Sequence, residues 1–214
     1  MNTYSKTDFE KFESRYRARF FNSIVGYKPI SLIGTTDSEG NENVALFSRL
    51  VHIGSRPAYI GVVFRPHSVR RDTFENIRQT KQFTINHIHE GMYKQAHQTA
   101  AKYDALVSEF EKTGLTPAYG TLNVPYVKEA KVRIGLEFAE EQEIKVNKTI
   151  LVIGRVIEVQ VNPQFIKNDG FVDINGAGSM LSSNIDAYYT ARKVARLDYP
   201  QPEKEVSELA ENLF

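Results

Sequence analysis

The apolar residues of this 214-residue chain fall into short runs of strand-like composition, and this pattern limits the folds that the chain can adopt. Helical segments lie between some of the runs, but they do not alternate with them regularly. A parallel α/β sheet requires regular alternation, whereas many short strands with irregular insertions favour a barrel. The sequence therefore predicts a mainly β fold, a β-barrel with helical insertions.

The predicted strands are 29–36, 44–48, 57–64, 82–88, 131–138 and 149–161. The turn-rich segment "DSEGNEN" joins the first two strands and predicts a hairpin. The run "PAYIGVVF" is apolar on both faces, so we expect a buried strand. In "KVRIGLEF" apolar and polar residues alternate, which is typical of a strand with one buried face.

Three segments favour helices. Asp72 and Glu75 have the spacing of a capping box and predict a short helix. The segment 103–114 has an apolar stripe at helical spacing and ends at a glycine. The tail, about 203–214, has a similar stripe. We therefore expect one domain over residues 1–214, with a short N-terminal segment and a helical tail.

Composition excludes several classes of function. The net charge of +1 gives no support to nucleic-acid binding. Without cysteine there is no disulfide, no thiolate metal site and no cysteine nucleophile, so redox chemistry requires a bound cofactor. No apolar run reaches about 18 residues and the N-terminus has no signal-like core, so we expect a cytoplasmic protein without membrane contact. Rossmann, Walker and G-x-S-x-G motifs are absent from the sequence.

The stretch "FRPHSVRRDTFENI" places three arginines around the junction of a strand and a helix. Arg65 closes the strand, and Arg70 and Arg71 precede the first turn of the helix. Unpaired N–H groups of that turn, arginine side chains and the hydroxyl of Thr73 can together bind a phosphate. Asp72 would compete for the same N–H groups or hold an arginine in place. The same residues are compatible with an ordinary capped surface helix.

The segment "NVALFS", residues 43–48, has small side chains among strand-forming residues. Small side chains allow a flat ligand to approach the main chain, whose N–H and C=O groups can read its polar edge. The alternative is a plain strand end.

Three of the five histidines lie in one segment, 85–103. His87 and His89 would share one face of a strand, and His97 or Glu90 could complete a metal site. No strong metal-binding spacing is present, so the sequence predicts no metal. His97 and the neighbouring Asn86 can instead donate hydrogen bonds to a bound ligand, or the histidines can be satisfied inside the fold.

Several segments together resemble one family. "NVALFS" after a hairpin, "RPHSVRRDTFENI", "FTINHI", "AHQTAAKYDALVSEFEKTGL" and "VPYVKEA" follow one another as in the flavin reductase-like family of FMN-binding split β-barrel proteins, in its flavoredoxin-like branch. The resemblance covers roughly residues 25–195. The chain departs from the family at Leu46, where proline is common, and at Ala100, where serine is common.

The resemblance implies a fold and a cofactor site: a split β-barrel with FMN in a groove at a homodimer interface. The implied flavin-lining residues are Asn43, Ala45, Leu46, Phe47 and Ser48; the implied phosphate-binding residues are Arg65, Arg70, Arg71, Asp72 and Thr73; Asn86 and His97 are implied near the flavin. No catalytic acid or base is indicated.

The resemblance also implies a function. We expect an oxidoreductase that passes electrons from NADH or NADPH through FMN to free flavin or a small acceptor. One alternative is an FMN-binding electron carrier or flavin store without nicotinamide activity. A third is a split-barrel protein for another phosphorylated planar ligand, such as pyridoxal phosphate, or for a haem-related molecule.

Overall fold

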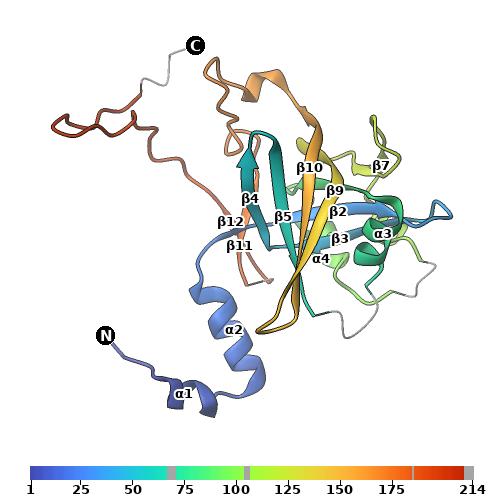
Figure 1. The fold of residues 1–214 in the computed structure, drawn as a ribbon, viewed down its shortest axis with the longest axis horizontal. Coiled ribbons are helices and arrows are strands. Elements are labelled where there is room, and N and C mark those ends of the chain that lie inside the picture. The colour runs from blue at the N-terminus through green and yellow to red at the C-terminus, as the bar shows by residue number, and fades with distance from the viewer. Residues whose placement is uncertain (67–70, 104–106, 185, 210–214) are drawn as a thin grey trace.

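The computed structural model describes residues 1–66, 71–103, 107–184 and 186–209, and its largest feature is a seven-stranded antiparallel sheet (Figure 1). The strand order is β3-β2-β6-β9-β10-β5-β4. The strands are β2 (Ser31–Thr36), β3 (Glu42–Phe47), β4 (Leu50–Ser55), β5 (Ala58–Phe64), β6 (Gln82–His87), β9 (Val132–Ile144) and β10 (Thr149–Val161). The predicted mainly β fold is confirmed.

The two edge strands of this sheet, β3 and β4, are joined by only two residues, Ser48 and Arg49. In a flat sheet of seven strands the edges would lie roughly 29 Å apart. The two-residue link spans at most about 10 Å. The sheet must therefore curl until its edges approach. The N–H of Val63 in β5 donates to the carbonyl of Arg49 at 2.9 Å, and the rings of Phe47 and Phe64 lie 5.0 Å apart.

A buried hydrophobic cluster fills the barrel. It consists of Ile33, Val62, Phe64, Phe74, Ile77, Phe83, Ile85, Leu136, Ile150 and Val152. Two of these residues, Phe74 and Ile77, come from helix α3 (Asp72–Thr80), which packs against β2 and β3. Burying each of these side chains stabilises the fold by about 2 kcal/mol. The core therefore fixes the start of α3 beside the barrel.

Helix α3 begins at Asp72, and its N-cap is Arg71. The sequence predicted Asp72 as the cap of a capping box, so this prediction is wrong by one residue. The cap residue makes no side-chain hydrogen bond to the helix. The N-terminal turn of α3 is thus not capped by the side chain of Arg71.

A second hydrophobic cluster covers the outer face of β2 and β3. It consists of Ile30, Leu32, Val44, Ile88, Met92, Ala96, Phe110, Leu115, Val127, Ala130 and Met180. The covering elements are α4 (Tyr93–Gln98), α5 (Glu109–Thr113), β8 (Tyr126–Val127) and the small sheet of β1 (Lys28–Pro29), β11 (Met180–Ser183) and β12 (Ala187–Thr190). Strand β8 pairs with β7 (Pro117–Ala118). A 3₁₀ turn, η1 (Pro163–Phe165), follows β10.

Most of the predicted strands are confirmed. The hairpin of β2 and β3 has Ser31 opposite Phe47, and its turn is closed by Asp37, whose carboxylate accepts from two main-chain N–H groups. The predicted helix over 103–114 differs: α5 covers only Glu109–Thr113 and ends at Gly114 in the left-handed conformation. Residues 104–106 lie outside the described residues.

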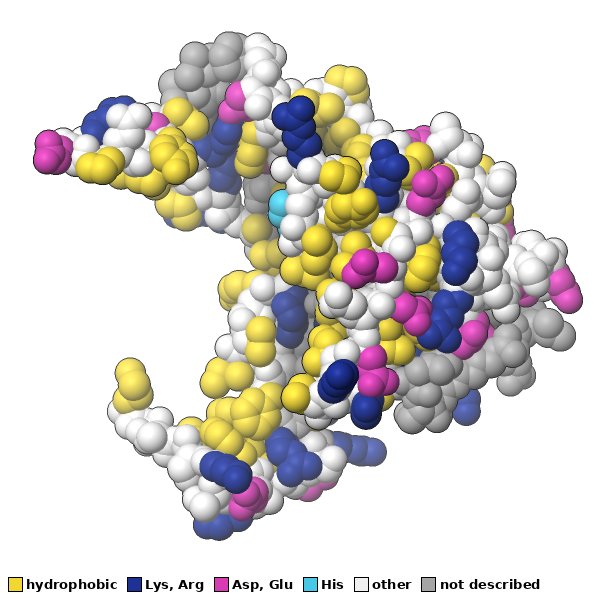
Figure 2. All heavy atoms as spheres, viewed as in Figure 1, with side chains coloured by type: hydrophobic (Ala, Val, Ile, Leu, Met, Phe, Trp, Pro, Cys, Tyr) yellow, Lys and Arg dark blue, Asp and Glu magenta, His cyan; other side chains and the backbone are white. Residues whose placement is uncertain are grey.

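The N-terminal segment forms two helices that sequence analysis did not predict, α1 (Lys6–Lys11) and α2 (Ser14–Ile24). Figure 1 shows them projecting from the barrel, and Figure 2 shows their hydrophobic side chains gathered on one side. They are held to each other by aromatic rings, with Phe9 5.0 Å from Phe21 and Phe12 4.8 Å from Tyr16. The helical spacing of these aromatic residues was the signal for the two helices.

The tail differs from its prediction. Residues 203–209 form no helix, and Glu208 makes an isolated β-bridge with Leu197; residues 210–214 lie outside the described residues. Within the described part of the chain, no helix is long and apolar enough to cross a membrane.

A close approach at Gly34 in β2 gives a test of the packing. A Cβ there would lie 2.1 Å from the carbonyl oxygen of Pro125, a main-chain atom that cannot rotate away. We expect Gly34→Ala to lower the free energy of unfolding by about 2–3 kcal/mol, measured by urea titration. The matched control is Gly54→Ala in β4, where the nearest atom would be 3.7 Å away. Equal effects of the two substitutions would contradict the packing described here.

Candidate functional site

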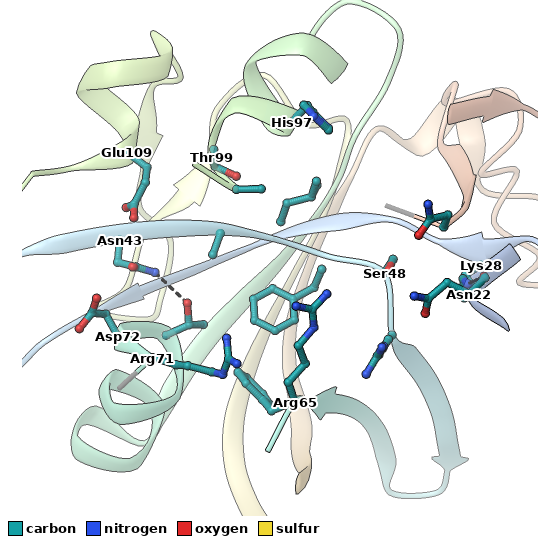
Figure 3. Close-up of a pocket in the computed structure, with 18 residues that line it drawn as sticks. Asn22, Lys28, Asn43, Ser48, Arg65, Arg71, Asp72, His97, Thr99 and Glu109 are labelled. Atoms are coloured by element: carbon teal, nitrogen blue, oxygen red, sulfur yellow. Dashed lines mark hydrogen bonds between the residues drawn. The ribbon is translucent and has the colours of Figure 1, made fainter. Parts of the chain in front are cut away.

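A cavity of about 380 Å³ lies where the edges of the barrel meet. One wall is β3, from Asn43 to Phe47, and continues into the link Ser48–Arg49. The end of β5 and the start of α3 form another wall, and α4 and α5 contribute His97 and Glu109 (Figure 3). Cavities of this size are typical of small-molecule sites.

Most of the residues predicted for the site line this cavity. The predicted site residues that line it are Asn43, Ala45, Leu46, Phe47, Ser48, Arg65, Arg71, Asp72, Thr73 and His97. Asn86 does not line it, and Arg70 lies outside the described residues.

Arg71 has the most informative side chain in the cavity. Its Nε atom is buried and has no hydrogen-bond partner. A buried charged donor without a partner is costly, because the group has lost water and gained nothing in return. The guanidinium lies beside the start of α3, and the positive end of the helix dipole there also favours an anion. An oxyanion bound here would accept a hydrogen bond from the unpartnered Nε, so the residues present fit a phosphate group.

Thr73 belongs to a buried polar network that ties α3 to the sheet. The side-chain amide of Asn43 in β3 donates to the hydroxyl of Thr73 at 3.1 Å and to the hydroxyl of Thr35 in β2 at 3.2 Å. Asn76 in α3 donates to the same Thr35 hydroxyl at 3.2 Å. Since Thr73 accepts from Asn43, its own proton remains available for a ligand in the cavity.

The strand wall of the cavity is regular. Leu46, which stands where the family often has proline, pairs with Leu32 of β2, and its neighbour Ala45 pairs with Ile33. The departure from proline thus leaves β3 a continuous strand. The small side chain of Ala45 leaves the main chain of this wall open to a flat ligand.

Glu109 places a carboxylate at the cavity wall. It accepts a hydrogen bond from the N–H of Val44 at 3.3 Å. Burial raises the pKa of Glu109, and the charge of Asp72 raises it further. Sequence analysis missed this residue because it appeared only as an exposed position of a predicted surface helix.

Asn86 is fully buried, and its side-chain amide is hydrogen-bonded within the protein. Its amide nitrogen donates to the carbonyl of Leu32 and to the hydroxyl of Thr84, and its amide oxygen accepts from the N–H of Val127 at 2.9 Å. These bonds connect β6 to β2 and β8. The structure thus gives Asn86 a place between strands, away from the cavity.

The histidines are separated by the fold. His89 uses both ring nitrogens, accepting from the N–H of Gly91 and donating to the carbonyl of Glu129. His87 pairs with the hydroxyl of Ser179 at 2.9 Å, and burial lowers the pKa of His87 to about 4. In the part of the chain that the structure describes, no three His, Cys, Asp or Glu side chains are grouped to hold a metal.

His97 alone of the three histidines reaches the cavity, and Tyr188 of β12 holds its ring. Nδ1 of His97 lies 2.8 Å from the Tyr188 hydroxyl, and the two rings are 5.7 Å apart. Burial and the nearby charge of Asp186 raise the pKa of Tyr188 to about 12, so its hydroxyl stays protonated at neutral pH.

The family model of the flavin reductase like domain matches residues 27–178 of this chain. The chain belongs to this flavin reductase like family. The matched range contains the barrel, α3 and nearly every side chain of the cavity. Membership makes the protein a flavin-related oxidoreductase and supports a flavin cofactor.

Relatives agree with this assignment. A crystal structure of a candidate flavin reductase with a split barrel domain from Shewanella frigidimarina is 42% identical, with 94% of this chain and 100% of that chain covered and a TM-score of 0.90. The nitrilotriacetate monooxygenase component B of Bacillus cereus shares the fold at 21% identity, with 92% and 98% covered and a TM-score of 0.79. An uncharacterised protein of Aquifex aeolicus is 31% identical over 144 residues, 60% of this chain and 74% of that protein.

The low pKa of His87 predicts a pH dependence of stability. In the unfolded chain His87 takes up a proton near pH 6.5, whereas in the folded protein its ring stays neutral down to about pH 4. We expect the free energy of unfolding to fall by roughly 1–3 kcal/mol as the pH is lowered through this window. Urea titrations between pH 4 and 8 measure this change.

The matched variants are His87→Gln and His52→Gln. Glutamine does not titrate, so His87→Gln should lose this part of the pH dependence. His52 is exposed on β4, and its replacement should keep the wild-type profile. A wild-type profile in His87→Gln would contradict the prediction.

Proposed function

We propose that this protein binds FMN in the cavity and passes electrons from NADH or NADPH to free flavin or a small acceptor. The observation that carries the proposal is the buried Nε of Arg71, a charged donor without a partner at the start of α3. A phosphorylated ligand satisfies it, whereas riboflavin alone would not.

Each wall of the cavity has a part in this proposal. The main chain of β3 and the small side chain of Ala45 line the flavin ring, and Arg71 and Thr73 hold its phosphate. His97, fixed by Tyr188, borders the ring region. When bound, the flavin supplies hydride and electron transfer, and the protein supplies orientation and access. The proposal assigns no catalytic acid or base.

Two features predicted from the sequence remain proposals here. We propose a homodimer and a cytoplasmic location on the resemblance to the family. Gel filtration with light scattering measures the first, and cell fractionation the second.

Replacement of Arg71 tests the position of the phosphate. We expect Arg71→Gln to weaken FMN binding by about 1.5–3 kcal/mol, or roughly 10- to 150-fold, because a charged hydrogen bond to phosphate is lost. Binding of riboflavin, which lacks the phosphate, should change little. Quenching of flavin fluorescence measures both affinities.

The control for this experiment lies on the same helix. Arg78 of α3 pairs with Glu141 and stays away from the cavity, so Arg78→Gln should leave both affinities unchanged. An equal loss of FMN and riboflavin binding in Arg71→Gln would place the phosphate elsewhere.

A second experiment separates an enzyme from an electron carrier. We expect purified protein to retain about one flavin per chain after incubation with FMN and gel filtration, read from the absorbance near roughly 450 nm. The loaded protein should then oxidise NADH or NADPH in the presence of excess free flavin. A retained flavin without nicotinamide oxidation would instead support a carrier or flavin store. A haem-like spectrum in the protein as purified would contradict both.

A further inference from the structure

Two further cations, Lys28 and Arg49, line the cavity, and they lie close enough for their charges to repel. Figure 3 shows Lys28 and its neighbour Asn22 on the opposite side of the cavity from Arg71, with Arg65 between them. We call Lys28 and Arg49 the distal cationic pair. Sequence analysis missed both residues, since each stands alone in a segment without a charge cluster.

No carboxylate neutralises the distal cationic pair among the residues that the structure describes. The ammonium of Lys28 donates to the main-chain carbonyl of Asn22, which also accepts from the N–H of Asn184 at 3.3 Å. The guanidinium of Arg49 has neither a hydrogen-bond nor an ion-pair partner in the described part of the chain. Lys28 is thus held by the fold, and no described carboxylate balances the charge of the pair.

Like charges and burial make this arrangement unfavourable without an anion. Burial lowers the pKa of Lys28 and the charge of Arg49 lowers it further. Burial likewise lowers the pKa of Arg49, with the charge of Arg65 adding to the effect. Bringing an anion to this side of the cavity relieves both the repulsion and the desolvation.

A flavin mononucleotide has only one phosphate, and the proposed function assigns it to Arg71 and Thr73. The distal cationic pair is therefore left open to a second anion beside the flavin ring. We propose that Lys28 and Arg49 bind the diphosphate of the nicotinamide dinucleotide, so that they select this class of electron donor. The forked guanidinium of Arg49 matches the oxygens of a diphosphate, and Lys28 adds a compact charge. This inference rests on the proposed function.

The first test compares donors with and without phosphate. In the FMN-loaded double variant Lys28→Gln/Arg49→Gln, we expect the KM for NADH to rise about tenfold or more, because two charged contacts are lost. The rate with 1-benzyl-1,4-dihydronicotinamide, which has no phosphate, should be unchanged. The matched control is Lys145→Gln/Arg155→Gln, which removes two exposed charges outside the cavity and should behave as wild type.

The second test does not depend on turnover. Calorimetry should detect inorganic pyrophosphate binding to the FMN-loaded wild-type protein, and the Lys28→Gln/Arg49→Gln variant should bind it at least about tenfold more weakly. The FMN affinity of the same variant should stay within about twofold of wild type.

Four results would overturn the proposal. The first is that pyrophosphate does not bind to the FMN-loaded wild-type protein. The second and third concern Lys28→Gln/Arg49→Gln: a loss of FMN affinity as large as in Arg71→Gln, or a loss of rate with the phosphate-free donor equal to the loss with NADH. The fourth is that this variant has a raised KM for the acceptor and an unchanged KM for NADH. The last would assign the pair to an anionic acceptor instead.

Failure of the proposed function is distinguishable from failure of this inference. If the protein retains no flavin, the proposed function fails at the absorbance measurement. Pyrophosphate binding is then measured on apoprotein that carries Arg65→Gln and Arg71→Gln, so that these two arginines cannot hold the anion. If this apoprotein binds pyrophosphate and loses the binding when Lys28 and Arg49 are also replaced, the distal cationic pair is an anion site. If it does not bind pyrophosphate while Lys28 and Arg49 are present, the inference is overturned.

Discussion

Two residues, Ser48 and Arg49, connect the opposite edges of a seven-stranded sheet, and the rest of the structure depends on this short connection. Because the link is far shorter than the width of a flat sheet, the sheet closes on itself. Closure creates an interior for the hydrophobic cluster and brings the ends of β3 and β5 together. The cavity lies along this link, so the constraint that shapes the barrel also positions the site.

The proposed phosphate site depends on the barrel core for its rigidity. Phe74 and Ile77 anchor α3 in the hydrophobic cluster, and the network of Asn43, Thr73 and Thr35 ties its first turn to two strands. A buried hydrogen-bond network of this kind holds side chains in one arrangement. The start of α3 and the strand wall of the cavity therefore form one unit, which suits a cofactor that must be held in a fixed orientation.

Charge is distributed unevenly around the cavity. Lysine and arginine side chains line it from Lys28 to Arg71, whereas Glu109 lies against the N–H of Val44 at the α5 wall. Such charges act on a bound anion more strongly than charges in bulk water do. In the function proposed above, the neutral flavin ring lies between these charged groups and leaves a place for an anionic second substrate.

The sequence by itself determined the local elements and the basic junction. The hairpin turn indicated β2 and β3, alternating apolar residues indicated β9, and the arginines before α3 indicated an anion site, because turn chemistry, periodicity and residue type act over a few neighbours. Only the tertiary structure decided which side chains share the cavity. The amide of Asn86 can bind a ligand, but its hydrogen bonds are made between strands. Lys28 and Arg49 carry no local signal, and only the folded structure shows that both line the cavity. Long-range strand pairing sets these distances, and no short stretch of sequence encodes it.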